Sequence, residues 1–87
     1  MNNKFLDSLK ELLKFQGLKL KKDSTGPEKG IITYKISRSR ELLLKCSGED
    51  RQLLTTLLIE LKSIYKMKLK VKPGFTNVSH RYIYVIF

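Results

Sequence analysis

The chain has few of the residues that catalytic and metal centres usually require. Its 87 residues include one histidine, His80, one cysteine, Cys46, and only eight acidic residues. One histidine and one cysteine cannot supply the usual ligand set of a zinc site, and one cysteine cannot form a disulfide within the chain. The short motifs of metalloproteases, serine hydrolases, redox dithiols and phosphate-binding loops do not occur in it. We therefore expect no enzyme, no cofactor, no metal site and no small-molecule substrate.

Long apolar runs are also missing. The most apolar stretch, residues 53–64, is interrupted by two threonines, a glutamate and a lysine, whereas a bilayer-spanning helix needs about 20 mostly apolar residues. The first eight residues lack a basic segment followed by an apolar run, which a signal peptide would have. Two prolines and five glycines are too few for a linker-rich chain. We therefore expect a single domain over residues 1–87, without a membrane span and located in the cytoplasm.

Positive charge is what the sequence does have in excess. Lys and Arg number 18 against eight acidic residues, a formal net charge of +10. Residues 51–87 hold seven of these basic residues and one acidic residue. Solubility of a small domain needs a net charge of only about 2–8. The surplus therefore indicates a polyanionic partner, and nucleic acid is the first candidate.

The spacing of apolar residues predicts two helices and five strands. Leucine stripes at helical spacing indicate helices, and alternation of apolar and polar residues indicates strands. Gly17 lies where a left-handed residue would end the first helix, and Ser47 to Asp50 matches a capping box for the second. The predicted helices span 3–16 and 50–65, and the predicted strands span 18–22, 31–36, 41–46, 68–72 and 81–87.

These elements predict an α+β fold with the order α-β-β-β-α-β-β. Each leucine stripe needs an apolar partner, and one face of an antiparallel sheet can cover both helices. We therefore expect a two-layer sandwich, with two helices on one face of a mostly antiparallel sheet. Cys46 alternates with Leu42 and Leu44 and should lie in the core. The last strand is apolar on both faces and should lie inside the sheet.

Alternation along the strands also sorts the charges. Lys19 and Lys21 oppose the leucines of their strand, and Lys68, Lys70 and Lys72 oppose Leu69 and Val71. Alternate residues of a strand lie about 7 Å apart, a spacing that roughly suits consecutive phosphates. The candidate nucleic-acid-binding residues are Lys19, Lys21, Lys22, Arg38, Arg40, Arg51, Lys66, Lys68, Lys70, Lys72 and Arg81.

These side chains have two other interpretations. Lysines at alternate strand positions also protect sheet edges and keep a protein soluble, although +10 exceeds that need. Tyr34, Tyr82 and Tyr84 have the rings needed to stack on bases, but their strand positions predict that they belong partly to the core. The expected mode of binding is therefore contact with phosphates and shape, with little reading of bases.

Several segments together resemble a known family, large-subunit ribosomal protein 22 of the eukaryotic type. The similarity covers about residues 4–87. Its parts are Phe5-Leu6 with Leu9, Gly30-Ile31-Ile32-Thr33, the turn Ser37–Arg40, then Leu54, Leu57 and Leu61, and finally Arg81-Tyr82-Ile83-Tyr84. The resemblance implies a ribonucleoprotein component that functions in translation. It would bind ribosomal RNA, with neighbouring ribosomal proteins as possible partners. It also implies that the 37–40 turn lies on RNA and that Arg51 occupies a basic family position.

Two alternatives from other classes remain open. The same order of elements resembles phage middle-promoter transcription activators, whose sheet-based domain would bind duplex DNA. It also resembles kinase-associated adaptor modules, in which a basic face would bind acidic lipid or an acidic protein segment.

Overall fold

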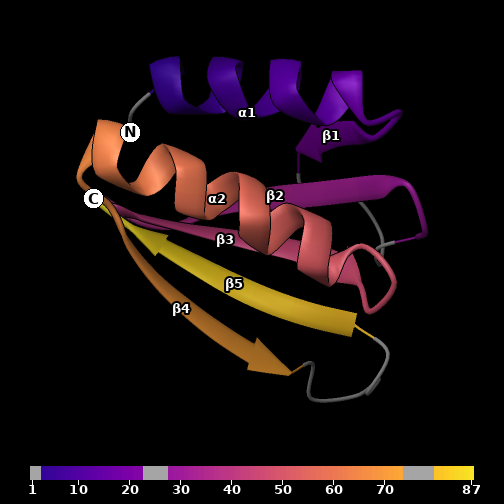
Figure 1. Ribbon diagram of the computed structural model, residues 1–87. Coiled ribbons are helices and arrows are strands. Elements are labelled where there is room, and N and C mark those ends of the chain that lie inside the picture. The colour runs from indigo at the N-terminus through magenta and orange to yellow at the C-terminus, as the bar shows by residue number, and fades with distance from the viewer. Residues whose placement is uncertain (1–2, 23–27, 74–79) are drawn as a thin grey trace.

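The computed structural model describes residues 3–22, 28–73 and 80–87, with the backbone alone at 71–73, 80 and 81 (Figure 1). It confirms an α+β protein with two helices and a mostly antiparallel sheet of five strands. The elements are α1 (Asn3–Phe15), β1 (Lys19–Lys22), β2 (Ile31–Arg38), β3 (Glu41–Ser47), α2 (Arg51–Tyr65), β4 (Lys68–Pro73) and β5 (His80–Ile86).

The strands lie in the order β1-β2-β3-β5-β4. β1 pairs with β2 in parallel, and every other pair is antiparallel. β5 therefore lies between β3 and β4, in the interior position predicted from its apolar character. An irregularity between Ile36 and Arg38 interrupts the register of β2 and β3 just before their connecting turn.

The core joins both helices to one face of the sheet, here called the covered face. In Figure 1, α2 crosses in front of the central strands and α1 lies beside it, over β1. Leu42, Leu44 and Cys46 of β3 are fully buried, which confirms the predicted core position of the cysteine. Burying one leucine side chain stabilises a fold by about 1.5–3 kcal/mol. The helical members of the core are Phe5, Leu9 and Leu13 of α1, and Leu54, Leu57, Leu58 and Leu61 of α2.

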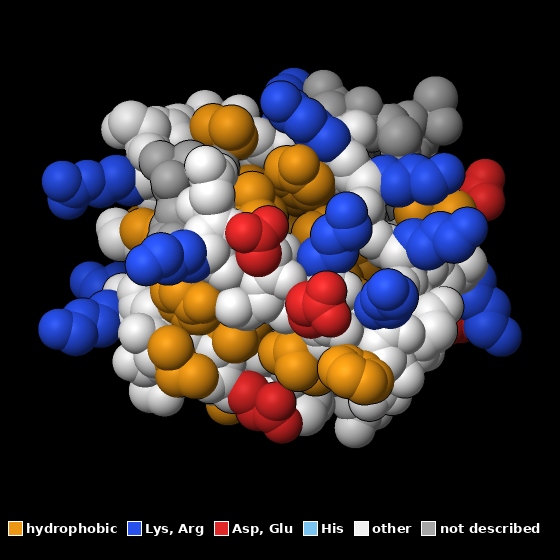
Figure 2. Space-filling view, turned by 90° about the horizontal axis from the view of Figure 1, so that it is seen from above, with side chains coloured by type: hydrophobic (Ala, Val, Ile, Leu, Met, Phe, Trp, Pro, Cys, Tyr) orange, Lys and Arg blue, Asp and Glu red, His pale blue; other side chains and the backbone are white. Residues whose placement is uncertain are grey.

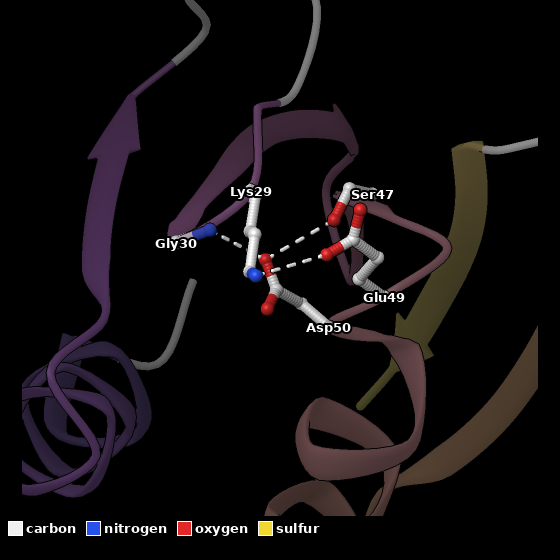
Figure 3. A network of polar contacts seen from close by, with 5 residues as sticks. All are labelled: Lys29, Gly30, Ser47, Glu49 and Asp50. Atoms are coloured by element: carbon white, nitrogen blue, oxygen red, sulfur yellow. Dashed lines mark hydrogen bonds and ion pairs between the residues drawn. The ribbon is translucent and has the colours of Figure 1, made fainter.

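The start of α2 is held by a buried carboxylate (Figure 3). Asp50 Oδ2 accepts a hydrogen bond of 2.7 Å from the backbone N–H of Gly30 and one of 3.2 Å from the Ser47 hydroxyl. Asp50 is itself the N-cap residue, and its side chain makes no bond to the helix. The capping box predicted for Ser47 to Asp50 is therefore wrong, because the carboxylate joins the start of β2 to the β3–α2 connection instead.

The two helices are also joined to each other through Tyr65, the last residue of α2. Its hydroxyl lies 2.7 Å from Ser8 Oγ and donates to the backbone carbonyl of Lys4 at 3.2 Å. Its ring meets Phe5 edge to face, with 5.7 Å between ring centres. The first helix ends as predicted, because Gly17 adopts a positive φ of 75°, a conformation that glycine reaches without steric cost.

Candidate nucleic-acid interface

The register of the strands places a second set of residues opposite the covered face, and we call this set the open face. Cross-strand partners share a face of a sheet, so the pairing defines rows that run across it. One row is Lys21, Thr33, Lys45 and Tyr82; the next is Lys35, Leu43, Tyr84 and Lys70; the third is Arg38, Glu41, Ile86 and Lys68. Lys19 and Ile31 complete the open face on β1 and β2. Among the described residues, no helix packs on this side.

Charge is distributed unequally between the open face and the helices. Among the residues whose side chains the structure describes, the open face holds seven basic residues and one acidic residue, Glu41, a net charge of +6. The two helices together hold five basic and three acidic residues, a net charge of +2. Figure 2 views the molecule from the α1 side and shows acidic side chains between the basic ones there. The positive surplus is therefore concentrated on the sheet.

Two tyrosines lie among the open-face lysines. Tyr82 and Tyr84 are half-buried, and both belong to the interior strand β5. The Lys45 ammonium lies 5.8 Å from the centre of the Tyr82 ring, within the range of a cation–π interaction. Tyr34 on β2 packs instead against the core cluster. Tyr82 and Tyr84 therefore lie on the charged open face, contrary to the expectation that all three tyrosines belong partly to the core.

A shallow hollow of about 310 Å³ lies at the end of the open face nearest the β2–β3 turn. Its lining combines two cations, one carboxylate, a hydroxyl, an aromatic ring and an aliphatic side chain. These belong to Arg38, Lys70, Glu41, Ser37, Tyr84 and Ile86. The rows of the sheet explain why these residues meet, since Arg38 pairs with Glu41, Glu41 with Ile86, and Lys70 with Tyr84.

The structure brings some of the predicted site residues together and separates others. Lys19, Lys21, Arg38, Lys68 and Lys70 all lie on the open face. The other predicted residues with described side chains are exposed but lie away from the open face. Lys22 lies on the opposite side of the sheet, beside Tyr34, and Arg40 lies in the β2–β3 turn. Arg51 begins α2, and Lys66 directly follows the end of α2. Lys72 and Arg81 are strand residues whose side chains lie outside the described part of the chain.

Two central lysines of the open face were missed in the sequence. Lys35 of β2 is exposed, and Lys45 of β3 is half-buried. The signal was present, because Lys35 alternates with Tyr34 and Ile36, and Lys45 alternates with Leu44 and Cys46. Each is the only lysine of its strand, however, and only the pairing of β2, β3, β5 and β4 places them on one face with the lysines of the edge strands.

Within residues 3–22, 28–73 and 80–87, no three His, Cys, Asp or Glu side chains gather as metal ligands would. In the same described ranges, neither helix has the length and apolarity that crossing a membrane requires.

No protein-family model matches the chain, and no match was found among curated proteins or solved structures.

Proposed function

We propose that this protein is a non-catalytic RNA-binding protein and that the open face is its RNA-binding surface. The concentration of seven basic residues on one side of the sheet, counted over the described side chains, supports this proposal most directly. Neutralising the RNA backbone with Lys and Arg releases condensed counterions, which is the main source of affinity in such interfaces. In this proposal the helices form one layer and the sheet the other, so RNA binds where the helices do not.

The dimensions of the open face suit a nucleic-acid strand. Neighbouring strands of a sheet lie about 4.8 Å apart, and alternate residues along a strand about 7 Å apart. Lys35, Lys45 and Lys70 belong to three different strands, so their ammonium groups form a patch rather than a single row. Such a patch can contact several phosphates of one strand without any motion of the backbone.

Two observations favour RNA with exposed bases over duplex DNA or an acidic membrane. Tyr82 and Tyr84 lie among the lysines and are partly exposed to solvent. Aromatic rings stack on unpaired bases, whereas bases inside a duplex are already stacked on each other. A purely electrostatic membrane contact would not need them. Duplex DNA and anionic vesicles are therefore the competing ligands in the tests below.

We propose the large ribosomal subunit in the cytoplasm as the location of this RNA. This part of the proposal rests on the similarity to large-subunit ribosomal protein 22 and on two exposed arginines, Arg38 at the end of β2 and Arg40 in the β2–β3 turn. The turn adjoins the open face through the Arg38–Glu41 pair. Ribosomal RNA and neighbouring ribosomal proteins would then be its partners.

Two triple variants test whether the open face, rather than net charge, carries binding. Lys35→Gln, Lys45→Gln and Lys70→Gln remove three charges from the open face, while Lys10→Gln, Lys14→Gln and Lys62→Gln remove three from the helices. We expect the open-face variant to lose at least tenfold in affinity for single-stranded RNA at low salt. The slope of log K against log [salt] should fall by about 0.7 per lost phosphate contact. Fluorescence anisotropy measures both quantities.

The helix variant is the control, because both variants have the same net charge. It should bind nearly as tightly as the unmodified protein. Equal losses in the two variants would show that binding depends on overall charge and would contradict an RNA-binding open face. Preference for duplex DNA or for anionic vesicles over single-stranded RNA would favour the corresponding alternative.

Sedimentation tests the proposed location separately. The protein should co-sediment with large ribosomal subunits from its native host and remain bound at moderate salt. Recovery of the protein in the soluble fraction at low salt would contradict the ribosomal assignment. RNA binding by the isolated protein would still be tested separately by fluorescence anisotropy.

A further inference from the structure

We propose that the hollow at the end of the open face is a binding pocket for a single unpaired guanine base. This inference rests on the proposed function, because it assigns a base specificity to the same surface. It goes beyond phosphate contact, which would make the protein indifferent to sequence. The pocket is formed by Ser37, Arg38, Glu41, Lys70, Tyr84 and Ile86.

Glu41 is the unusual member of this pocket. It is the one acidic residue among the described residues of a face with seven basic ones, and a carboxylate there repels the phosphates that the face would attract. It lies opposite Arg38 in the register of β2 and β3, but these two side chains form no ion pair with each other. Within the described residues, the ion pair that forms joins Lys29 and Glu49. Glu41 and Arg38 are thus two opposite charges in one hollow, each available to a ligand.

Guanine is the base whose edges match this pair of charges. A carboxylate has two acceptor oxygens and no donor, and guanine presents two neighbouring donors, N1–H and the N2 amino group. The fork of an arginine donates to O6 and N7 of guanine in the commonest base-specific contact. Adenine places an amino group where O6 would be, and uracil lacks both N7 and an amino group. Glu41 and Arg38 together therefore select guanine.

The remaining pocket residues supply contacts that any base would share. Tyr84 offers an aromatic face and Ile86 an aliphatic one, and stacking a base on an aromatic ring depends little on its identity. Lys70 lies beside Tyr84 in the sheet register, where its ammonium can contact the phosphate of the bound nucleotide. A base in the hollow would thus be held by stacking and phosphate contact, and identified by Glu41 and Arg38.

The test uses RNA heptamers that differ in one base. Fluorescence anisotropy compares seven uridines with the same strand carrying a central guanosine, adenosine, inosine or 7-deazaguanosine. We expect the guanosine strand to bind about tenfold more tightly than the uridine or adenosine strand, the gain of a good bidentate contact. Inosine lacks the N2 amino group that meets Glu41, and 7-deazaguanosine lacks the N7 that meets Arg38. Each should bind with intermediate affinity.

Variants assign the preference to the pocket. Glu41→Gln replaces one acceptor with a donor, so the preference for guanosine over uridine should fall severalfold, to the part that Arg38 contributes, while binding of the uridine strand stays the same or tightens. Arg38→Lys keeps the charge but loses the fork, so it should reduce the preference and keep the salt dependence. Glu60→Gln on α2 makes the same charge change outside the pocket and should keep the preference intact.

The outcomes separate this inference from the function on which it rests. If the heptamers bind equally well and with strong salt dependence, the open face binds RNA but the pocket does not select guanine. The same conclusion follows if Glu41→Gln leaves the preference unchanged. If none of the heptamers binds at low salt, the proposed function itself is wrong.

Discussion

The two faces of the sheet differ although they are built from the same strands. On the covered face of β3, Leu42, Leu44 and Cys46 are fully removed from solvent. On its open face, Leu43 and Lys45 are only half-buried. The covered face therefore contributes stability, and the open face concentrates charge. Because alternate residues of a strand point to opposite faces, a substitution can alter one property and leave the other nearly unchanged.

Neighbouring leucines of β3 provide the largest contrast between the faces. Leu44→Ala should lower the free energy of unfolding by about 2–5 kcal/mol, because it leaves a cavity in the core. Leu43→Ala removes the same atoms from a half-buried position on the open face and should cost about 1 kcal/mol. Chemical denaturation monitored by circular dichroism measures both. Equal losses for the two variants would show that the open face is packed like a core.

The polar attachment of α2 to the sheet should give the next largest effect. Asp50→Ala removes the acceptor for the Gly30 N–H and the Ser47 hydroxyl, and leaving a buried donor unpaired costs about 1–3 kcal/mol. The neighbouring Glu49→Ala removes only an exposed ion pair with Lys29, which should contribute at most about 1 kcal/mol. A loss for Glu49→Ala as large as that for Asp50→Ala would argue against the structural role given to Asp50.

A smaller effect is expected where the two helices meet. Tyr65→Phe keeps the edge-to-face contact with Phe5 but removes the hydroxyl that contacts Ser8 and the Lys4 carbonyl. The variant should lose about 0.5–1.5 kcal/mol, the usual net contribution of a hydrogen bond. The shift of the denaturation midpoint would measure this loss, provided that the dependence of unfolding free energy on denaturant concentration stays the same. An unchanged midpoint would mean that water satisfies these groups equally well.

The smallest change in stability is expected from the open-face triple variant. Lys35→Gln, Lys45→Gln and Lys70→Gln remove like charges from one surface and no core atoms. Each surface substitution should change stability by no more than about 0.5 kcal/mol, even though RNA binding falls at least tenfold. A thermal melt that showed unfolding of this variant would overturn the assignment of these lysines to a solvent-exposed face.

Much of the secondary structure was predictable because its signals are local. The leucine stripes of both helices and the left-handed Gly17 require only neighbouring residues to be identified. The capping box at Ser47 failed for the opposite reason. The carboxylate of Asp50 meets the backbone of Gly30, which is 20 residues away in the chain, and no local pattern reveals that contact.

The candidate site was predictable only in part. Alternation placed Lys19, Lys21, Lys68 and Lys70 on the correct side of their strands. It also assigned Lys22, Arg51 and Lys66 to the site, but the structure leaves these on the surface away from the open face. The tyrosines of β5 were predicted to belong partly to the core, since a strand with apolar residues on both sides does not show by itself which side is covered.

The amino-acid sequence by itself determined the strong positive charge, the helices and strands, and the alternation that separates lysines from leucines along each strand. The apolar character of β5 indicated an interior strand, but only the tertiary structure decided that its neighbours are β3 and β4, which places Tyr84 beside Lys70 and Glu41 beside Ile86. The physical reason is that periodicity is a property of one segment, whereas a binding surface needs several segments in a defined register. That register arises only when the leucines of α1 and α2 are buried against one face of the sheet.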